Sequence, residues 1–257
     1  MPKPRTLHEH PAAKKRFGQN FLVDQKIIEK IAAAVGITPG TRVIEIGPGR
    51  GALTGELIAA GGVVKAVEID RDLQSYLLEK FSGVENFSLV PHDILQTRLE
   101  DVAAPKFKVV GNLPYNISTA ILERLAGERQ LFTDAVLMFQ REVAERIAAP
   151  PDSAERGYLS VIAQAAFAIE RLFDIGPQAF RPQPKVWSTV VKITPRPENI
   201  FDRGEVRSLV SKGFSQRRKM LRNTLKGVAV SSEVLDLSRR AESLTLDEWS
   251  SLAETLN

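Results

Sequence analysis

The sequence predicts an α/β protein: a parallel sheet with helices on both faces, followed by a small C-terminal all-helical domain. Short β-branched runs alternate with helical patterns over the first two-thirds of the chain. Glycines are concentrated where the first of these runs gives way to a helix. Towards the C-terminus the apolar residues keep helical spacing only. Because parallel strands need crossover connections, the β–α alternation favours a parallel sheet.

The N-terminal residues 1–23 are predicted to form a flexible, basic leader. Its first part lacks apolar periodicity, and it lacks the long apolar core of a secretory signal. A helix is predicted to follow, with Asp24 as its N-cap, because apolar side chains recur at helical spacing at Ile27, Ile28, Ile31 and Val35.

The β–α units follow in order. The predicted strands are Arg42–Ile46, Val63–Ile69, Phe87–Val90, Phe107–Val110 and Ala135–Phe139, and the predicted helices are 52–58, Arg71–Lys80 and Ser118–Leu125. The apolar stretch Tyr158–Ala168 is predicted to be helical, and Trp187–Ile193 to be the last strand. A Pro-containing linker at Thr194–Asn199 divides the chain into a domain at 24–195 and a helical domain at 196–257.

Composition excludes several classes of protein. Of the 257 residues, 43% are hydrophobic and 26% are charged, which excludes wholesale disorder. The absence of Cys removes disulfides and thiol catalysis, and a total of three His argues against a His-built metal site. No apolar run approaches the ~18 residues of a membrane span. We therefore expect a cytoplasmic protein with no metal.

Positive charge is concentrated in two places. Between Gly204 and Gly227 there are seven basic residues and one acid, Glu205. A second cluster, Lys14, Lys15 and Arg16, lies in the leader. Either cluster alone could be a solvated face, but two of them on a chain with a pI near 9.3 favour a polyanionic partner.

The glycine-rich turn Gly47–Gly51 predicts a cofactor loop. Glycines at a strand-to-helix turn allow a ligand to approach the backbone, and Glu68 ends the next strand, a position suited to binding ribose hydroxyls. A dinucleotide and S-adenosylmethionine both fit this pattern. Glu45 disfavours a pyrophosphate and suits a ligand with sulfonium and ammonium groups. Asp93 could accept from an adenine amino group, or could simply cap a helix.

After the strand Phe107–Val110 comes Asn112-Leu113-Pro114-Tyr115, and here the sequence resembles the adenine-N6 RNA dimethyltransferases, most closely their bacterial small-subunit ribosomal RNA branch. The resemblance covers nearly the whole chain. The segments that carry it are Phe17–Leu22, Val43–Thr54, Asn112–Thr119, Gln140–Ile147, Phe180–Val186 and Gln216–Asn223.

The resemblance implies a Rossmann-like class I S-adenosylmethionine-dependent methyltransferase fold, with S-adenosyl-L-methionine as cofactor. It implies that the leader folds over this cofactor as a lid. The cofactor-binding residues expected on this basis, together with the loop argument above, are Asn20, Leu22, Gly47, Gly49, Glu68, Asp93 and Asn112.

The tetrapeptide suits methylation of an exocyclic adenine amine. The lone pair of this amine is delocalised into the ring. The Asn112 side-chain oxygen and the Leu113 carbonyl would accept both N–H hydrogens and free the lone pair for attack on the methyl group. Pro114 stiffens the turn, and Tyr115 can stack on the extruded base. The resemblance implies that Phe180 covers the other face of the base.

The function implied is dimethylation of two adjacent adenosines near the 3′ end of small-subunit (16S) ribosomal RNA, by a monomer acting on a pre-ribosomal 30S particle. Three alternatives remain at this point: a non-catalytic ribosome-assembly or RNA-binding factor, a large-subunit ribosomal RNA methyltransferase, and an NAD(P)-linked oxidoreductase. The expected RNA-binding residues are Arg217, Arg218, Lys219 and Arg222, with Lys14, Lys15 and Arg16 as a second contact.

Overall fold

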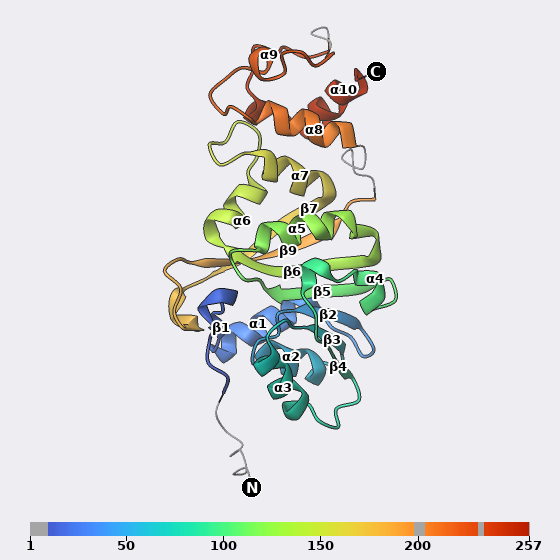
Figure 1. The fold of residues 1–257 in the computed structure, drawn as a ribbon, viewed down its shortest axis with the longest axis vertical. Helices are drawn as coiled ribbons and strands as arrows, with labels where there is room; N and C mark the ends of the chain where they lie inside the picture. Colours follow the sequence, from blue (N-terminus) through green and yellow to red (C-terminus); the bar gives the residue numbers. More distant parts are fainter. Residues whose placement is uncertain (1–9, 198–203, 231–233, 257) are drawn as a thin grey trace.

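A seven-stranded sheet lies at the centre of the computed structural model, which describes residues 10–197, 204–230 and 234–256 (Figure 1). Side by side, its strands are β4 (Phe87–Val90), β3 (Val63–Val67), β2 (Arg42–Ile46), β5 (Phe107–Asn112), β6 (Phe132–Gln140), β9 (Ser188–Pro195) and β7 (Phe167–Ile175). Strands β2 to β6 run parallel. Strand β3 lies on one side of β2, and β5, which follows later in the chain, lies on the other side. This reversal of strand order creates a crevice at the carboxyl ends of β2 and β5.

The predicted α/β fold is confirmed, but a purely parallel sheet is wrong at one edge. Strand β9 runs antiparallel to both β6 and β7. The sequence prediction missed β7 and extended a helix to Ala168, whereas α7 (Tyr158–Ala166) ends two residues earlier. Strand β7 is an edge strand with few fully buried side chains, so its residues give no clear two-residue alternation of apolar and polar types.

Helices cover both faces of the sheet (Figure 1). One face carries α1 (Gln25–Val35), α2 (Ala52–Ala59) and α3 (Arg71–Lys80); the other carries α4 (Leu99–Val102), α5 (Ser118–Gly127), α6 (Arg141–Ala148) and α7. The Asp24 side chain caps α1 by accepting from the backbone N–H groups of Lys26 and Ile27, as predicted. None of the helices within the described ranges is long and apolar enough to span a bilayer.

The C-terminal helices form a second hydrophobic core. They are α8 (Gly204–Gly213), α9 (Leu221–Thr224) and α10 (Leu246–Glu254), and they pack around the buried Trp249. Helix α7 joins the two cores, because Leu159 and Ala163 face the sheet while Val161 and Ile162 face this second core. The helical spacing that the sequence shows from Val206 to Leu225 does not correspond to one helix: residues 214–220 form a loop between α8 and α9.

The leader is joined to the body of the protein by a separate two-stranded sheet. Strand β1 (Phe21–Leu22) pairs antiparallel with β8 (Phe180–Arg181). A short 3-10 helix, η1 (Lys15–Phe17), precedes it. This pairing places the described part of the leader beside the carboxyl ends of β2 and β5, next to the crevice.

Candidate active site

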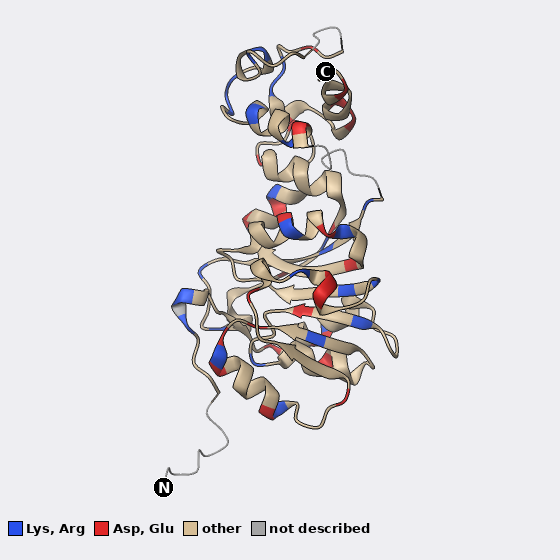
Figure 2. Ribbon diagram, turned by 45° about the vertical axis from the view of Figure 1, so that its right-hand side comes forward, with Lys and Arg blue, Asp and Glu red and all other residues tan. Residues whose placement is uncertain are grey.

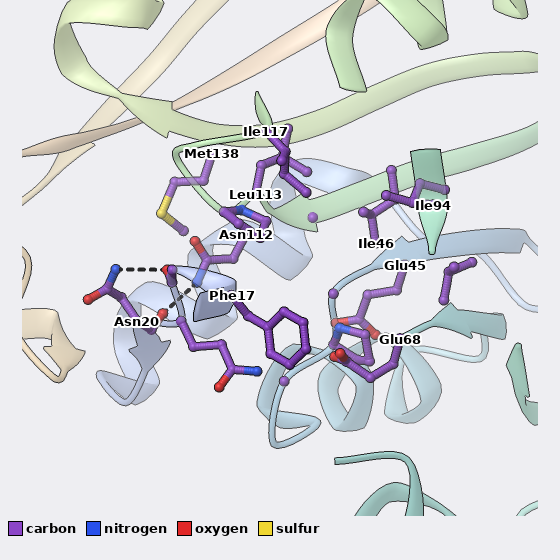
Figure 3. Close-up of a pocket in the computed structure, with 18 of the residues that line it drawn as sticks. Phe17, Asn20, Glu45, Ile46, Glu68, Ile94, Asn112, Leu113, Ile117 and Met138 are labelled. Carbon is purple, nitrogen blue, oxygen red and sulfur yellow. Dashed lines mark hydrogen bonds between the residues drawn. The ribbon is translucent and has the colours of Figure 1, made fainter. Parts of the chain in front are cut away.

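A cavity of about 310 Å³ lies at the carboxyl ends of β2, β3 and β5 (Figure 3). Its volume is at the lower end of the range for small-molecule sites. Its lining comes from the leader at 16–22, the glycine-rich loop at 46–50, the end of β3, residues 92–95 and the segment at 111–117. The cavity therefore joins most of the segments that the sequence analysis singled out.

The glycine-rich loop adopts the backbone that glycine favours. Gly47, Gly49 and Gly51 have φ of 65°, 59° and 69°, and α2 begins directly after them. A Cβ placed on Gly49 would lie 3.0 Å from the ring of Phe21 in β1. The loop thus needs glycine for its turn and for the close approach of the leader.

Two buried carboxylates line the cavity, Glu45 in β2 and Glu68 directly after β3. Glu45 is 2% exposed and accepts a 2.6 Å hydrogen bond from the Thr54 hydroxyl; Glu68 is 5% exposed and accepts from the backbone N–H of Asp70 at 2.9 Å. Burial raises the pKa of both, and that of Glu45 reaches about 7, with the nearby Glu68 adding to the rise. Two desolvated carboxylates fit a ligand that brings positive charge and hydroxyl donors, as S-adenosylmethionine does.

Cofactor binding is expected to tighten by about tenfold from pH 6 to pH 8 and to release a proton, because the ligand's positive charge favours ionised Glu45. Glu45→Gln is expected to remove this dependence. Calorimetry in buffers of different ionisation enthalpy measures the proton release, and a pH-independent affinity in the wild-type protein would contradict the expectation. Without ligand, the raised pKa means that the contribution of Glu45 to folding stability declines as pH rises from about 4.5 to 7.

Asp93 caps a helix, one of the two roles that the sequence left open, and it also lies at the cavity. Its side chain caps the short helix η2 (Ile94–Gln96) by accepting from the Leu95 N–H at 2.9 Å, and the residue also lines the cavity. The cap uses one carboxylate oxygen, Oδ1. The structure therefore places Asp93 at the cavity with its side chain fixed by the cap.

The tetrapeptide at 112–115 forms one wall of the cavity. Asn112 donates from Nδ2 to the backbone oxygen of Asn20 at 3.0 Å (Figure 3). This bond orients the amide so that Oδ1 remains as the acceptor. The Leu113 side chain is buried, and Pro114 and Tyr115 also line the cavity. The Tyr115 hydroxyl lies 2.7 Å from that of Ser188 in β9, a contact that restrains the ring.

Phe180 lies outside the cavity lining in this structure, and its contact with a base remains a prediction. Its side chain is fully buried in the core between the sheet and α1, and it is absent from the cavity lining. Its strand, β8, pairs with Leu22, which does line the cavity. In this structure Phe180 supports the leader from behind.

The leader is held across the cavity by polar contacts to Asp70, a residue that the sequence analysis missed. Asp70 is 1% exposed, forms an ion pair with Lys14, and accepts a 3.0 Å hydrogen bond from Gln19. Burial would raise the pKa of Asp70, but its hydrogen bonds with Lys14 and Gln19 hold it below the ordinary value. Lys14 also pairs with Asp72 at 2.7 Å. The ammonium of Lys14 is thus paired within the protein, and its contact with RNA remains a prediction.

Asp70→Asn is expected to speed cofactor dissociation by about tenfold, because the variant loses the charge that attracts Lys14. Asn remains a good N-cap for α3, so the melting temperature is expected to change little. Asp24→Asn, at the N-cap of α1, is the matched control, since the side-chain hydrogen bonds of Asp24 stay within its own cap. Stopped-flow dissociation measures the effect, and equal rates in the two variants would show that Asp70 does not hold the leader.

Gly111 is a second site residue that the sequence analysis missed. It immediately precedes Asn112 and lines the cavity, and a Cβ built on it would lie 2.9 Å from the carbonyl oxygen of Ile46 in β2. A glycine inside a strand often marks such a close backbone approach. The position of Gly111 inside the strand was therefore the sequence feature that could have identified it. The close packing of β5 against β2 fixes the position of Asn112 at the carboxyl end of β5.

The basic residues of the C-terminal region lie away from the cavity. Arg217, Arg218 and Lys219 are exposed in the loop between α8 and α9, and Arg222 is exposed on α9. Arg217 donates to the backbone oxygen of Ala154 at 2.6 Å. Figure 2 shows basic residues along this loop and acidic residues on α10. These four residues remain predicted RNA contacts.

The basic residues of the leader differ in their surroundings. Arg16 is exposed, lies over the ring of Phe17 at 4.6 Å, and borders the cavity. The side chain of Lys15 lies outside the described part of the structure. Arg16 therefore remains a predicted RNA contact at the mouth of the cavity.

Comparison with known structures identifies the class. A dimethyladenosine transferase from Plasmodium falciparum matches with a TM-score of 0.78 at 26% identity, covering 90% of this chain and 95% of that one. The 23S rRNA methyltransferase ErmE matches with a TM-score of 0.71 at 28% identity, covering 92% and 99%. The fold and its crevice are thus those of the S-adenosylmethionine-dependent methyltransferases, and the protein is an enzyme of this class.

Within this class, the chain belongs to the ribosomal RNA adenine dimethylase family, whose family model matches residues 11–257. Relatives named ribosomal RNA small subunit methyltransferase A include those of Hahella chejuensis and Methylococcus capsulatus. Each is 42% identical over 251 residues; the alignments cover 94% and 95% of this chain and 92% and 98% of the relatives. Membership excludes the oxidoreductase alternative, and the enzyme is an adenine dimethyltransferase that acts on ribosomal RNA.

Proposed function

We propose that this enzyme dimethylates the N6 amino groups of two adjacent adenosines near the 3′ end of small-subunit ribosomal RNA, as a cytoplasmic monomer acting on a pre-ribosomal particle. The observation that carries the choice of subunit is the 42% identity, over almost the whole chain, to relatives named for the small subunit. Identity to ErmE, which is named for 23S RNA, is 28%.

The residues of the cavity support the proposed chemistry. When bound, S-adenosylmethionine supplies an electrophilic methyl group. We expect Glu68 to accept from ribose hydroxyls, and Asp93 from an adenine amine. Asn112 is oriented with Oδ1 free to accept one hydrogen of the target amine, and the Leu113 carbonyl would accept the other. Both bonds favour a pyramidal nitrogen whose lone pair can attack in line.

A general base is not required by this arrangement. The methylated nitrogen carries a positive charge until it loses a proton, and a secondary or tertiary ammonium on an adenine ring is a strong acid that solvent can deprotonate. The second transfer needs only one N–H acceptor, because one hydrogen has already been replaced. Asn112 could therefore serve in both rounds.

Small subunits that lack the dimethylation test the proposal directly. They should accept four methyl groups per particle from labelled S-adenosylmethionine, all as N6,N6-dimethyladenosine in a 3′ fragment of the RNA. The same RNA freed of protein tests whether an assembled particle is needed, and large subunits test the alternative substrate. Labelling of large subunits alone would refute the small-subunit assignment. Cofactor binding without any transfer would favour a non-catalytic assembly factor.

A further inference from the structure

We propose that Trp187 is a stacking site for a nucleotide that flanks the target adenosine. Trp187 is 48% exposed and the preceding Val186 is 42% exposed. They end the loop between β8 and β9, at the same edge of the sheet as the cavity. This inference rests on the proposed function, since it assumes that the substrate is RNA with an extruded base.

The backbone of Trp187 is hydrogen-bonded to the start of α6, at the same edge of the sheet as the cavity. Its carbonyl oxygen accepts from the N–H of Arg141 at 2.9 Å, at the start of α6. The next residue, Ser188, is buried and bonds to the Tyr115 hydroxyl at 2.7 Å. Successive side chains of an extended segment point in opposite directions, so Ser188 faces the catalytic wall while Trp187 faces solvent. Trp187 is thus adjacent in sequence to Ser188, which contacts Tyr115 of the base pocket.

The surroundings of Trp187 suit a polyanion. Three acids lie on the neighbouring elements, and each is paired with arginine: Glu142 with Arg146, and both Glu145 and Asp174 with Arg141 and Arg171. Two further cations are exposed close to it in sequence, Lys185 in the same loop and Arg181 at the end of β8. The local charge near the indole is therefore positive, as an RNA-binding surface requires.

Helix α6 connects this position with the basic loop of the C-terminal region. The helix starts beside Trp187, and its eight residues span about 12 Å. The segment that follows it contains Ala154, whose carbonyl oxygen is bonded to Arg217. Helix α6 and the segment after it therefore link the position of Trp187 to the residues expected to bind phosphates. A strand whose adenine enters the cavity would pass the indole on its way to them.

An aromatic side chain at this position can replace a stacking interaction that is lost when a base is extruded. When one base leaves the stack, its neighbour loses a stacking partner. Indole offers a flat surface that stacks on any base, so it can replace the lost partner without reading sequence. This role differs from that of Tyr115, which lies within the cavity lining.

Tryptophan fluorescence tests the proposal, because the chain has only two Trp residues. Trp249 is fully buried, and its indole N–H has no hydrogen-bond partner within the described structure. Trp249→Phe therefore removes an unsatisfied donor and leaves Trp187 as the single reporter. The probe is a single-stranded RNA with two adjacent adenosines, added in the presence of S-adenosylhomocysteine. We expect quenching of the emission, and its loss when the nucleotides flanking the adenosines are abasic. If Trp249→Phe does not fold, the difference between the wild type and Trp187→Phe gives the same signal.

Affinity and turnover supply the second readout. Trp187→Ala is expected to raise the RNA dissociation constant and KM by about tenfold with little change in kcat, and Trp187→Phe to restore most of the loss. Leu78→Ala is the control, since Leu78 is 57% exposed on α3 and does not line the cavity. Unchanged affinity in Trp187→Ala would overturn the proposal. So would quenching that is unchanged when the nucleotides flanking the adenosines are abasic. Fluorescence quenching reports RNA binding and does not depend on methyl transfer. Failure of the proposed function would appear in the methyl-transfer assay, separately from the quenching.

Discussion

Asn112→Ala is expected to slow methyl transfer in a single turnover by about 10²–10³-fold, the scale seen when one preorganised polar group is removed from an active site. The Asn112 oxygen contributes mainly as the amine becomes pyramidal, so its loss affects the transition state more than the ground state. Cofactor affinity is expected to fall only modestly, through loss of the 3.0 Å bond to the Asn20 oxygen. Rapid-quench transfer to undermethylated small subunits measures the rate, and calorimetry measures the affinity.

Asn112→Asp separates the two functions of this side chain. The carboxylate keeps an acceptor for the target amine but cannot donate to Asn20. It is therefore expected to retain much more activity than Asn112→Ala while sharing its weaker cofactor binding. If Asn112→Ala transferred methyl groups at close to the wild-type rate, the side-chain oxygen would not be an acceptor in the transition state.

Replacing Arg217, Arg218 and Lys219 together with Ala is expected to weaken RNA binding by about 100-fold at 0.1 M salt. Each phosphate contact contributes roughly 0.7–0.9 to the slope of log K against log salt, so the loss of three lowers the slope by roughly 2–3. The three side chains are exposed in a loop far from the cavity. Cofactor affinity is therefore expected to stay unchanged. Filter binding over a salt series measures both quantities.

A charge-matched variant controls for net charge. Lys26, Arg98 and Lys106 are exposed and none of them lines the cavity, so their replacement by Ala is expected to leave the salt slope unchanged. Arg217 also donates to Ala154, and a melting curve of the triple variant checks that the fold survives. An unaltered slope in a folded triple variant would mean that the basic loop is a solvated surface.

Local sequence signals predicted much of the framework. The bounds of α3 and β4 were predicted as the structure has them, and α1 begins after the predicted Asp24 cap. The glycine-rich loop and the tetrapeptide at 112–115 were also found, because their chemistry lies in consecutive residues. Such features depend on interactions within a few positions of the chain, which a sequence displays directly.

Features that depend on distant partners were missed or misplaced. Strand β7 is an edge strand that exists through its pairing with β9, and its own residues do not alternate clearly. The sequence showed neither the pairing of Lys14 with Asp70 nor the burial of Phe180 in β8, which pairs with the leader.

The sequence by itself thus determined the α/β class and singled out the glycine-rich loop and the tetrapeptide at 112–115. The tertiary structure decided the antiparallel edge of the sheet, the contacts that hold the leader to Asp70, and the exposure of Trp187 at the start of β9. The physical reason is that hydrogen-bond geometry and apolar periodicity act between near neighbours in sequence. Burial, ion pairing and strand order depend on which remote segments the folded chain brings together.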